Sequence, residues 1–175
     1  MKDTASDTTF FTTIPSPVGR LTLVGSGDDL IGLHFEDDPR APTAGTEGCV
    51  RDDLRLRPAV VQMEEYFAGR RTRFDLSVAP RGTPFQRQVW KALQRIPYAE
   101  TTSYGELARS IGKPGAFRAV GGANNRNPIA IIIPCHRVIG ADGSMTGYGG
   151  GLPNKQLLLA LEAQVAAAPR LAASR

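Results

Sequence analysis

Residues 103–123 have the sequence SYGELARSIGKPGAFRAVGGA, which contains two short helical patterns on either side of a glycine-containing turn. Ser103 and Glu106 form a capping-box pattern, which predicts the start of the first helix. The second helix is predicted over Ala116–Ala123. Two short helices joined by such a turn are typical of a helix-turn-helix. The stretch therefore indicates a DNA-binding element.

The second of these helices has an unusual composition for a helix that reads bases. A DNA-reading helix normally presents several long polar side chains to the base edges, whereas this one presents Arg118 among Ala, Val and Gly. Small residues allow a backbone to approach a partner closely, so the pattern favours shallow insertion with one long side chain. The alternative is a helix corner, which is also common in enzymes, with small residues that only pack against a neighbouring helix.

The rest of the C-terminal half is predicted to be mainly helical. A capping box at Thr83–Gln86 predicts a helix that extends to Ile96. The apolar run Ile129–Ile133 is predicted as a short buried strand, and Asn154–Ala166 as a final helix. We expect a mainly α domain over residues 83–166, followed by a frayed tail over residues 167–175.

The N-terminal half has the pattern of a small α/β domain. Three segments with strand-like composition, separated by turns, predict an antiparallel meander: Thr8–Ile14, Arg20–Val24 and Leu30–Phe35. Apolar residues at helical spacing predict a helix over Leu54–Ala68, and renewed alternation predicts a strand over Arg73–Val78. We expect this domain over residues 1–78 and a linker over residues 79–82.

The two halves differ in charge. The 175 residues carry a net charge of +4, but residues 1–78 hold 9 basic and 13 acidic residues, whereas residues 79–175 hold 12 basic and 4 acidic residues. The difference between −4 and +8 indicates two units, of which the C-terminal one faces a polyanion. The alternative is that scattered surface charges happen to be distributed in this way.

The composition excludes several classes of protein. The chain lacks the run of roughly 18 apolar residues that a membrane span needs and the apolar segment of a secretory signal, so we expect a cytoplasmic protein without a membrane partner. Two cysteines, Cys49 and Cys135, argue for a reducing compartment. With His34 and His136 they lack the paired spacing of a structural zinc site, so no metal is expected.

A possible reactive group lies at Cys135-His136, directly after the apolar run. The thiolate is the nucleophilic form of cysteine, and an ordinary thiol is only about 3% ionised at pH 7, so a neighbouring base matters. In an extended chain the two side chains would point to opposite faces, and His136 would reach the sulfur only through a turn or a water. Glu162, on the predicted final helix, is the candidate that would orient the imidazole. The alternatives are a buried inert thiol and a solvated glutamate.

The order and spacing of several short motifs resemble those of the O6-alkylguanine-DNA alkyltransferases, also called methylated-DNA–protein-cysteine methyltransferases. The motifs are Arg118–Ala123 (RAVGGA), Asn127-Pro128, Ile133–Arg137 (IPCHR), Gly147-Tyr148 and Gly150-Gly151. Ser103-Tyr104 and the segment Phe85–Trp90 also fit, so the resemblance covers about residues 80–163, and the N-terminal half fits in outline. It implies a ribonuclease-H-like N-terminal domain with an antiparallel sheet and a winged helix-turn-helix C-terminal domain.

The resemblance implies a DNA-repair transferase that works once. It would move an alkyl group from O6 of guanine, and less readily from O4 of thymine, to Cys135, and the stable thioether would end its activity. His136 would take the thiol proton through a water, and Glu162 would stabilise the imidazolium. Tyr148 would donate to guanine N3, and Asn127 would hold the turn between the second helix and the reactive segment. No cofactor is implied.

The resemblance also implies how a monomer would hold double-stranded DNA. The helix-turn-helix would bind the minor groove with the alkylated guanine flipped into a pocket, and in a bacterium the protein would associate with the nucleoid. Arg118 would fill the place of the flipped base, and Tyr104 would crowd the target phosphate. The other implied DNA contacts are Ser103, Ala119, Gly122 and Ala123. The other implied pocket residues are Pro134, Val138 and Gly149, the last replacing a serine of some relatives.

Three other functions remain as alternatives: a lesion-binding relative without catalysis, a Cys-His hydrolase of another class, and a helix-turn-helix regulator. The presence of Cys135 argues against the first. A hydrolase would not explain the segments around Arg118 and Tyr148. A regulator would need a more polar reading helix.

Overall fold

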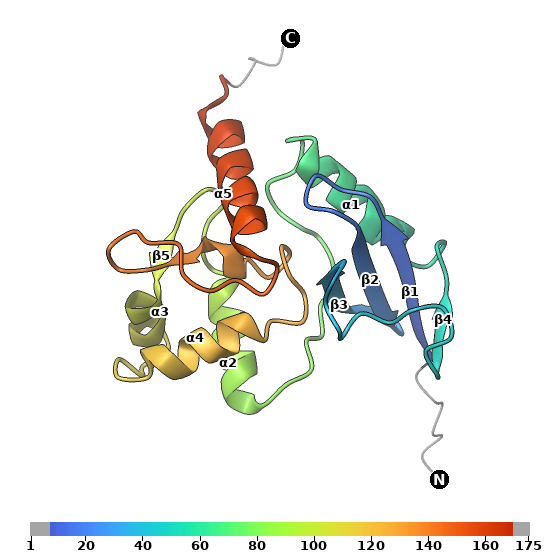
Figure 1. Ribbon diagram of the computed structural model, residues 1–175, viewed down its shortest axis with the longest axis horizontal. Coiled ribbons are helices and arrows are strands. Elements are labelled where there is room, and N and C mark those ends of the chain that lie inside the picture. The colour runs from blue at the N-terminus through green and yellow to red at the C-terminus, as the bar shows by residue number, and fades with distance from the viewer. Residues whose placement is uncertain (1–7, 170–175) are drawn as a thin grey trace.

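The computed structural model describes residues 8–169, which form two lobes (Figure 1). Residues 1–7 of the expected N-terminal domain and residues 170–175 of the expected tail lie outside the described part. The N-terminal lobe is a four-stranded sheet with strand order β3-β2-β1-β4 and one helix, α1. Its elements are β1 (Thr9–Ile14), β2 (Leu21–Ser26), β3 (Asp29–Phe35), β4 (Cys49–Arg51) and α1 (Arg57–Phe67).

The predicted antiparallel meander is confirmed, because β1 pairs with β2 and β2 with β3 in antiparallel register. Three details of the N-terminal prediction differ from the structure. β4 adds a parallel edge strand next to β1, which a period-2 pattern could not show in three residues. Residues 73–78 are not a strand and make one isolated bridge, between Leu30 and Val78. The helix also begins at Arg57, three residues later than predicted, with Pro58 in its first turn.

The C-terminal lobe is mainly helical, as predicted, and contains the helix-turn-helix. Its elements are α2 (Pro84–Leu93), β5 (Thr102–Ser103), α3 (Tyr104–Ser110), α4 (Phe117–Asn125), the 3-10 helix η1 (Cys135–Arg137), β6 (Val138–Ile139) and α5 (Leu152–Ala167). Both predicted capping boxes are present, at Thr83 and at Ser103. β5 and β6 form a small parallel sheet beside the helix-turn-helix. The predicted two-domain fold is therefore confirmed. No helix in the described residues has the length and apolarity to cross a membrane.

The apolar run Ile129–Ile133 is buried but is not the strand that we predicted. Ile131 has a positive φ of 69°, and Ile133 N donates back to the Ile129 carbonyl at 3.0 Å, so the segment folds into a turn. Only the start of the run is extended. Leu33 N donates to the Pro128 carbonyl at 2.9 Å, and Ala130 N donates to the Leu33 carbonyl at 3.2 Å. These bonds attach the reactive segment to the β3 edge of the N-terminal sheet.

A buried tryptophan fixes the second helix of the helix-turn-helix. Trp90 in α2 is 2% exposed, and its indole Nε1 donates to the Ala123 carbonyl at 2.8 Å. A buried indole N–H needs a partner, and this one is the last turn of α4. The bond therefore sets α4 against α2 and leaves the N-terminal end of α4 at the surface.

We expect Ser103→Ala to lower the free energy of unfolding by about 1 kcal/mol. The Ser103 hydroxyl accepts from Glu106 N at 3.2 Å, so alanine leaves a helix N–H without its cap. Urea unfolding monitored by circular dichroism measures the effect, with Ser103→Thr as the control that keeps the hydroxyl. An equal loss of stability in both variants would contradict this role for the cap.

Candidate active site

The thiol of Cys135 lies at the start of η1 and is buried, with 5% of the residue exposed. The short 3-10 turn replaces the extended chain considered above, so the side chains of Cys135 and His136 are not forced to opposite faces. Asn127 Nδ2 donates to Cys135 Sγ at 3.0 Å and to the Ile133 carbonyl at 2.8 Å. Its Oδ1 accepts from Ile129 N at 3.0 Å. Asn127 therefore spans the turn that leads from α4 to the thiol, where we expected it.

The imidazole of His136 reaches Glu162 on α5. The distance from His136 Nε2 to Glu162 Oε1 is 2.8 Å, and both side chains are fully buried. Because an ionised carboxylate only accepts hydrogen bonds, Nε2 carries the proton and Nδ1 is the unprotonated nitrogen. Nδ1 is buried and has no hydrogen-bond partner among the described residues. The arrangement thus offers a basic nitrogen, held in one tautomer by a carboxylate.

Arg137 shares this carboxylate, a role that no sequence pattern indicated. Arg137 Nε donates to Glu162 Oε2 and its Nη2 to Oε1, both at 2.9 Å. The remaining Nη1 donates to the Ile96 carbonyl at 2.8 Å. This bidentate pair holds Glu162 ionised and in one orientation. Arg137 is part of the quoted motif, but its spacing to a residue on a distant helix carries no local signal.

Burial dominates the electrostatics of the thiol and the imidazole. It raises the pKa of Cys135, an effect that the Asn127 hydrogen bond and the charge of Lys155 only partly offset. Burial also lowers the pKa of His136, against the effect of Glu162, so the imidazole is neutral at pH 7. Burial opposes ionisation of Glu162 as well, but the hydrogen bonds from His136 and Arg137 prevail and lower its pKa to about 2. The resting site therefore pairs a protonated thiol with a neutral base.

A small cavity lies beside the sulfur and has walls from both domains. It is lined by Cys135, Asn127, Tyr148 and Gly149, together with Phe35, Asp38 and Arg40 of the N-terminal domain. Its volume of about 10 Å³ holds no more than one water. The Tyr148 hydroxyl has no hydrogen-bond partner within the described residues, and it lies close enough to Cys135 to affect the pKa of the thiol. A purine could enter only after this cavity has widened.

Two of the expected pocket residues do not line the cavity. Pro134 lines a different groove, between the segments 72–78 and 94–98. Val138 is fully buried, and its carbonyl accepts from Lys155 Nζ at 2.6 Å. A base amine would have to use the second lone pair of that carbonyl. Lys155 is fully buried and also donates to the Thr146 carbonyl at 3.0 Å, a role that no sequence pattern indicated.

The expected DNA-binding residues divide between the surface and the core. Arg118 and Ala119 are exposed on the first turn of α4, and Gly122 is half-buried. Ala123 is 3% exposed and packs in the core, so its side chain does not face a ligand. The partly exposed residues Ser103 and Tyr104 begin α3, and the Tyr104 hydroxyl donates to the Thr146 carbonyl at 3.3 Å.

An exposed aromatic ring lies beside Arg118, the residue expected to fill the place of the flipped base. Phe117 is 49% exposed, and the Arg118 guanidinium lies 5.8 Å from the centre of its ring. A phenylalanine next to a single long basic side chain is visible in the sequence, but we did not predict a role for it.

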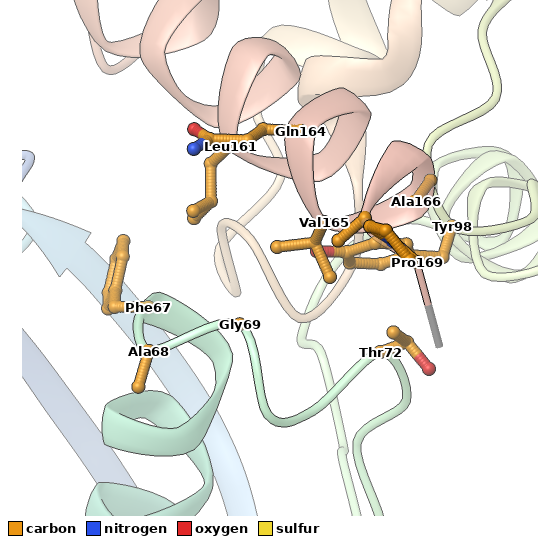
Figure 2. A pocket seen from close by; sticks show the side chains of 11 residues that line it. Phe67, Ala68, Gly69, Thr72, Tyr98, Leu161, Gln164, Val165, Ala166 and Pro169 are labelled. Atoms are coloured by element: carbon orange, nitrogen blue, oxygen red, sulfur yellow. The ribbon is translucent and has the colours of Figure 1, made fainter. Parts of the chain in front are cut away.

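A wide hollow among the described residues lies away from the thiol. It has a volume of about 720 Å³ and opens between the end of α1 and the C-terminal half of α5, with Phe67 and Val165 on opposite sides (Figure 2). Its lining has no cysteine, histidine, lysine, arginine or carboxylate side chain. Within residues 8–169 there is also no cluster of His, Cys, Asp and Glu that could hold a metal ion. The chemistry therefore centres on Cys135.

We expect the free energy of unfolding to fall as the pH is lowered from 7 to 2. Both His136 and Glu162 have lower pKa values in the folded protein than the ordinary values of 6.5 and 4.5. The unfolded chain therefore binds more protons below pH 6.5, first at the histidine and then, between pH 4.5 and about 2, at the glutamate. Urea unfolding over this range measures the loss. Glu162→Gln should show a smaller pH dependence below pH 4.5, and parallel curves would contradict the assignment.

Comparison with known proteins identifies the family. A family model described as the DNA binding domain of 6-O-methylguanine DNA methyltransferase matches residues 84–164. The model of the ribonuclease-like domain of the same methyltransferase matches residues 9–80. The chain therefore belongs to the 6-O-methylguanine DNA methyltransferase family, which confirms the resemblance stated for its sequence.

Similar proteins from bacteria and archaea match over nearly their whole length. The methylated-DNA–protein-cysteine methyltransferase of Mycolicibacterium paratuberculosis is 54% identical over 152 residues, which cover 87% of this chain and 91% of the relative. That of Methanosarcina barkeri is 51% identical over 153 residues, covering 87% and 96%. The crystal structure of Mycobacterium tuberculosis OGT in complex with DNA matches with a TM-score of 0.82 and 52% identity, covering 89% of this chain and 94% of that chain.

Proposed function

We propose that this protein repairs DNA by moving an alkyl group from O6 of guanine to Cys135. It is a methylated-DNA–protein-cysteine methyltransferase, as its relatives at about 50% identity are. The observation that carries the assignment is the buried thiol, held by Asn127 at the end of the turn that follows α4. O4-alkylthymine would be a slower substrate of the same thiol.

The transfer is one displacement at carbon. A bond forms between Cys135 Sγ and the alkyl carbon, while the bond from that carbon to O6 breaks and its electron pair returns to the base. The thiol proton passes through a bridging water to Nδ1 of His136, the unprotonated nitrogen of the buried imidazole. Glu162 stabilises the resulting imidazolium, and the Tyr148 hydroxyl donates a hydrogen bond to N3 of the leaving guanine. The guanine anion then takes up a proton from solvent as the imidazolium releases one. The thioether is stable, so each chain acts once.

The DNA would lie against the N-terminal end of α4. Arg118 and Ala119 are exposed there, and the C-terminal half of the chain carries the net positive charge. We propose that a monomer binds the minor groove, that the alkylated guanine is flipped out, and that Arg118 occupies the vacated place. The cavity beside Cys135 widens to admit the base. In a cell we place this activity in the cytoplasm, on nucleoid DNA if the cell is bacterial.

A division of the chain into two domains would fit these two tasks, DNA binding and alkyl transfer. We propose residues 1–78 and 83–166 as the domains, joined by the linker 79–82. Limited proteolysis would cut first within residues 79–82 if this boundary is right.

Single-turnover stoichiometry tests the proposed reaction. A duplex with one O6-methylguanine is supplied in tenfold excess over the protein, and the methyl groups removed are counted after hours. We expect one methyl group per chain and no further loss. Continued removal of methyl groups would favour a hydrolase, and binding without removal would favour a lesion-binding protein.

The variant Arg118→Ala tests whether Arg118 acts in base flipping and not in the alkyl transfer itself. We expect the variant to repair the duplex at least tenfold more slowly, because no side chain then fills the place of the flipped base and the flipped state is less stable. Transfer from the free base O6-methylguanine should be unchanged, because no flipping is needed. Arg109→Ala, in the last turn of α3, is the control for lost charge. An equal loss of transfer rate on the duplex and on the free base would contradict the proposal that Arg118 occupies the place of the flipped base.

A further inference from the structure

One buried hydrogen bond connects the N-terminal domain directly to the reactive residues. Tyr66 in α1 is fully buried, and its hydroxyl donates to Glu162 Oε1 at 2.8 Å. The two residues are 96 positions apart and belong to different domains. In Figure 1 the helices that carry them, α1 and α5, stand side by side where the two lobes meet.

Glu162 receives more donors than its oxygens can fully accept. Oε1 accepts from Tyr66, His136 and Arg137, at 2.8, 2.8 and 2.9 Å. Oε2 accepts from Arg137 Nε at 2.9 Å and from Ala99 N at 3.1 Å. A carboxylate offers about four lone-pair sites, two on each oxygen. Three donors on Oε1 therefore share two lone pairs, and Tyr66 competes with His136 for the charge on that oxygen.

We propose that Tyr66 is a positioning residue for the alkyl transfer, which keeps Glu162 in place and limits how strongly it attracts a proton to His136. The inference rests on the proposed function. The phenol cannot release its own proton near neutral pH, because burial and the charge of Glu162 raise its pKa. It therefore acts as a fixed donor. The N-terminal domain thus contributes to the chemistry as well as to the walls of the cavity.

Replacing Tyr66 by phenylalanine removes one hydroxyl group and leaves the other charged or titratable groups around the imidazole in place. Those that face His136 or Glu162 and carry charge or titrate are Cys135, Arg137, Lys155, Tyr98 and Tyr148. Removing the Tyr66 hydroxyl leaves four donors on Glu162 and returns part of the Oε1 charge to His136. The imidazolium becomes more stable, and the pKa of His136 rises.

Tyr66→Phe tests the proposal through the pH dependence of repair. The transfer rate of the intact protein on a duplex with O6-methylguanine should rise with pH as His136 loses its proton. In Tyr66→Phe the midpoint of this rise should move upward by on the order of one pH unit. The rate on the alkaline plateau should stay within about threefold of the original, because the neutral base is still present.

Tyr98→Phe is the matched control. Tyr98 packs edge-on against Tyr66 with ring centres 6.3 Å apart, but its hydroxyl makes no hydrogen bond within the described residues. The control should keep the original midpoint. An NMR titration of the imidazole signals measures the same effect without DNA. The chain has two histidines, and in Tyr66→Phe only the pKa of His136 should move.

The possible outcomes are distinct. If the unmodified protein transfers no methyl group, the proposed function fails. If it does, and Tyr66→Phe keeps the original midpoint or lowers the rate equally at every pH, Tyr66 is only a structural residue and the inference is wrong. A Tyr66→Phe protein that does not fold would also overturn it, because the ring and four donors to Glu162 remain.

Discussion

Cys135→Ala is expected to abolish methyl transfer while the affinity for DNA changes by less than about threefold. The sulfur is the only atom in the proposed step that forms the new bond, and no neighbour replaces it. The thiol is buried, whereas Arg118 and Ala119 are exposed on α4. Chemistry and DNA binding therefore depend on different residues. The transfer is measured by intact mass, and the affinity by fluorescence anisotropy with the same lesion duplex.

Cys49→Ala is the control for this experiment. Cys49 lies on the edge strand β4 of the N-terminal sheet, and its loss should leave the transfer rate unchanged. If Cys135→Ala lost DNA affinity to the same degree as transfer, the division between a binding surface and a reactive thiol would be wrong.

Glu162→Ala is expected to have the largest effect on stability. The carboxylate is fully buried and holds Arg137, His136, Tyr66 and Ala99 N. Removing it leaves a buried guanidinium without its counter-charge, which costs about 3–5 kcal/mol. For a protein of this length, the temperature of half-unfolding should fall by roughly 6–20 °C. Differential scanning calorimetry measures the shift.

Glu64→Ala provides the comparison. Glu64 is exposed on α1, so its loss should change the stability by less than about 0.5 kcal/mol. Similar shifts for the two variants would show that the buried carboxylate does not hold the two domains together. Transfer by a folded Glu162→Ala protein, assayed below its unfolding temperature, should also be slow because the imidazolium lacks its partner.

Much of the fold follows from local patterns. The capping boxes at Thr83 and Ser103 each specify a helix start within a few residues, because the side chains that cap the helix lie next to it. The antiparallel meander could also be predicted, since the alternation of apolar and polar residues and the turn residues are local features of the sequence. The parallel strand β4 could not be predicted in this way, because its three residues are a strand only through their pairing with β1.

The run Ile129–Ile133 shows the limit of apolar patterns. A short buried segment has the same composition whether it is a strand or a turn, and here the bonds to Leu33 and the positive φ of Ile131 decide. Within the site, Cys135 and His136 were visible as neighbours, and Glu162 was a candidate from its place on the predicted final helix, to which the resemblance assigned the same role. Tyr66 was not, since a contact across 96 residues leaves no mark on either local sequence.

The location of the transferred methyl group tests the central claim most directly. A duplex containing one O6-(trideuteromethyl)guanine is incubated with the protein, and the peptides are analysed by tandem mass spectrometry. The account predicts one labelled methyl group per chain, as a thioether on the peptide that contains Cys135. A label on Cys49, or release of the methyl group without a labelled peptide, would contradict it.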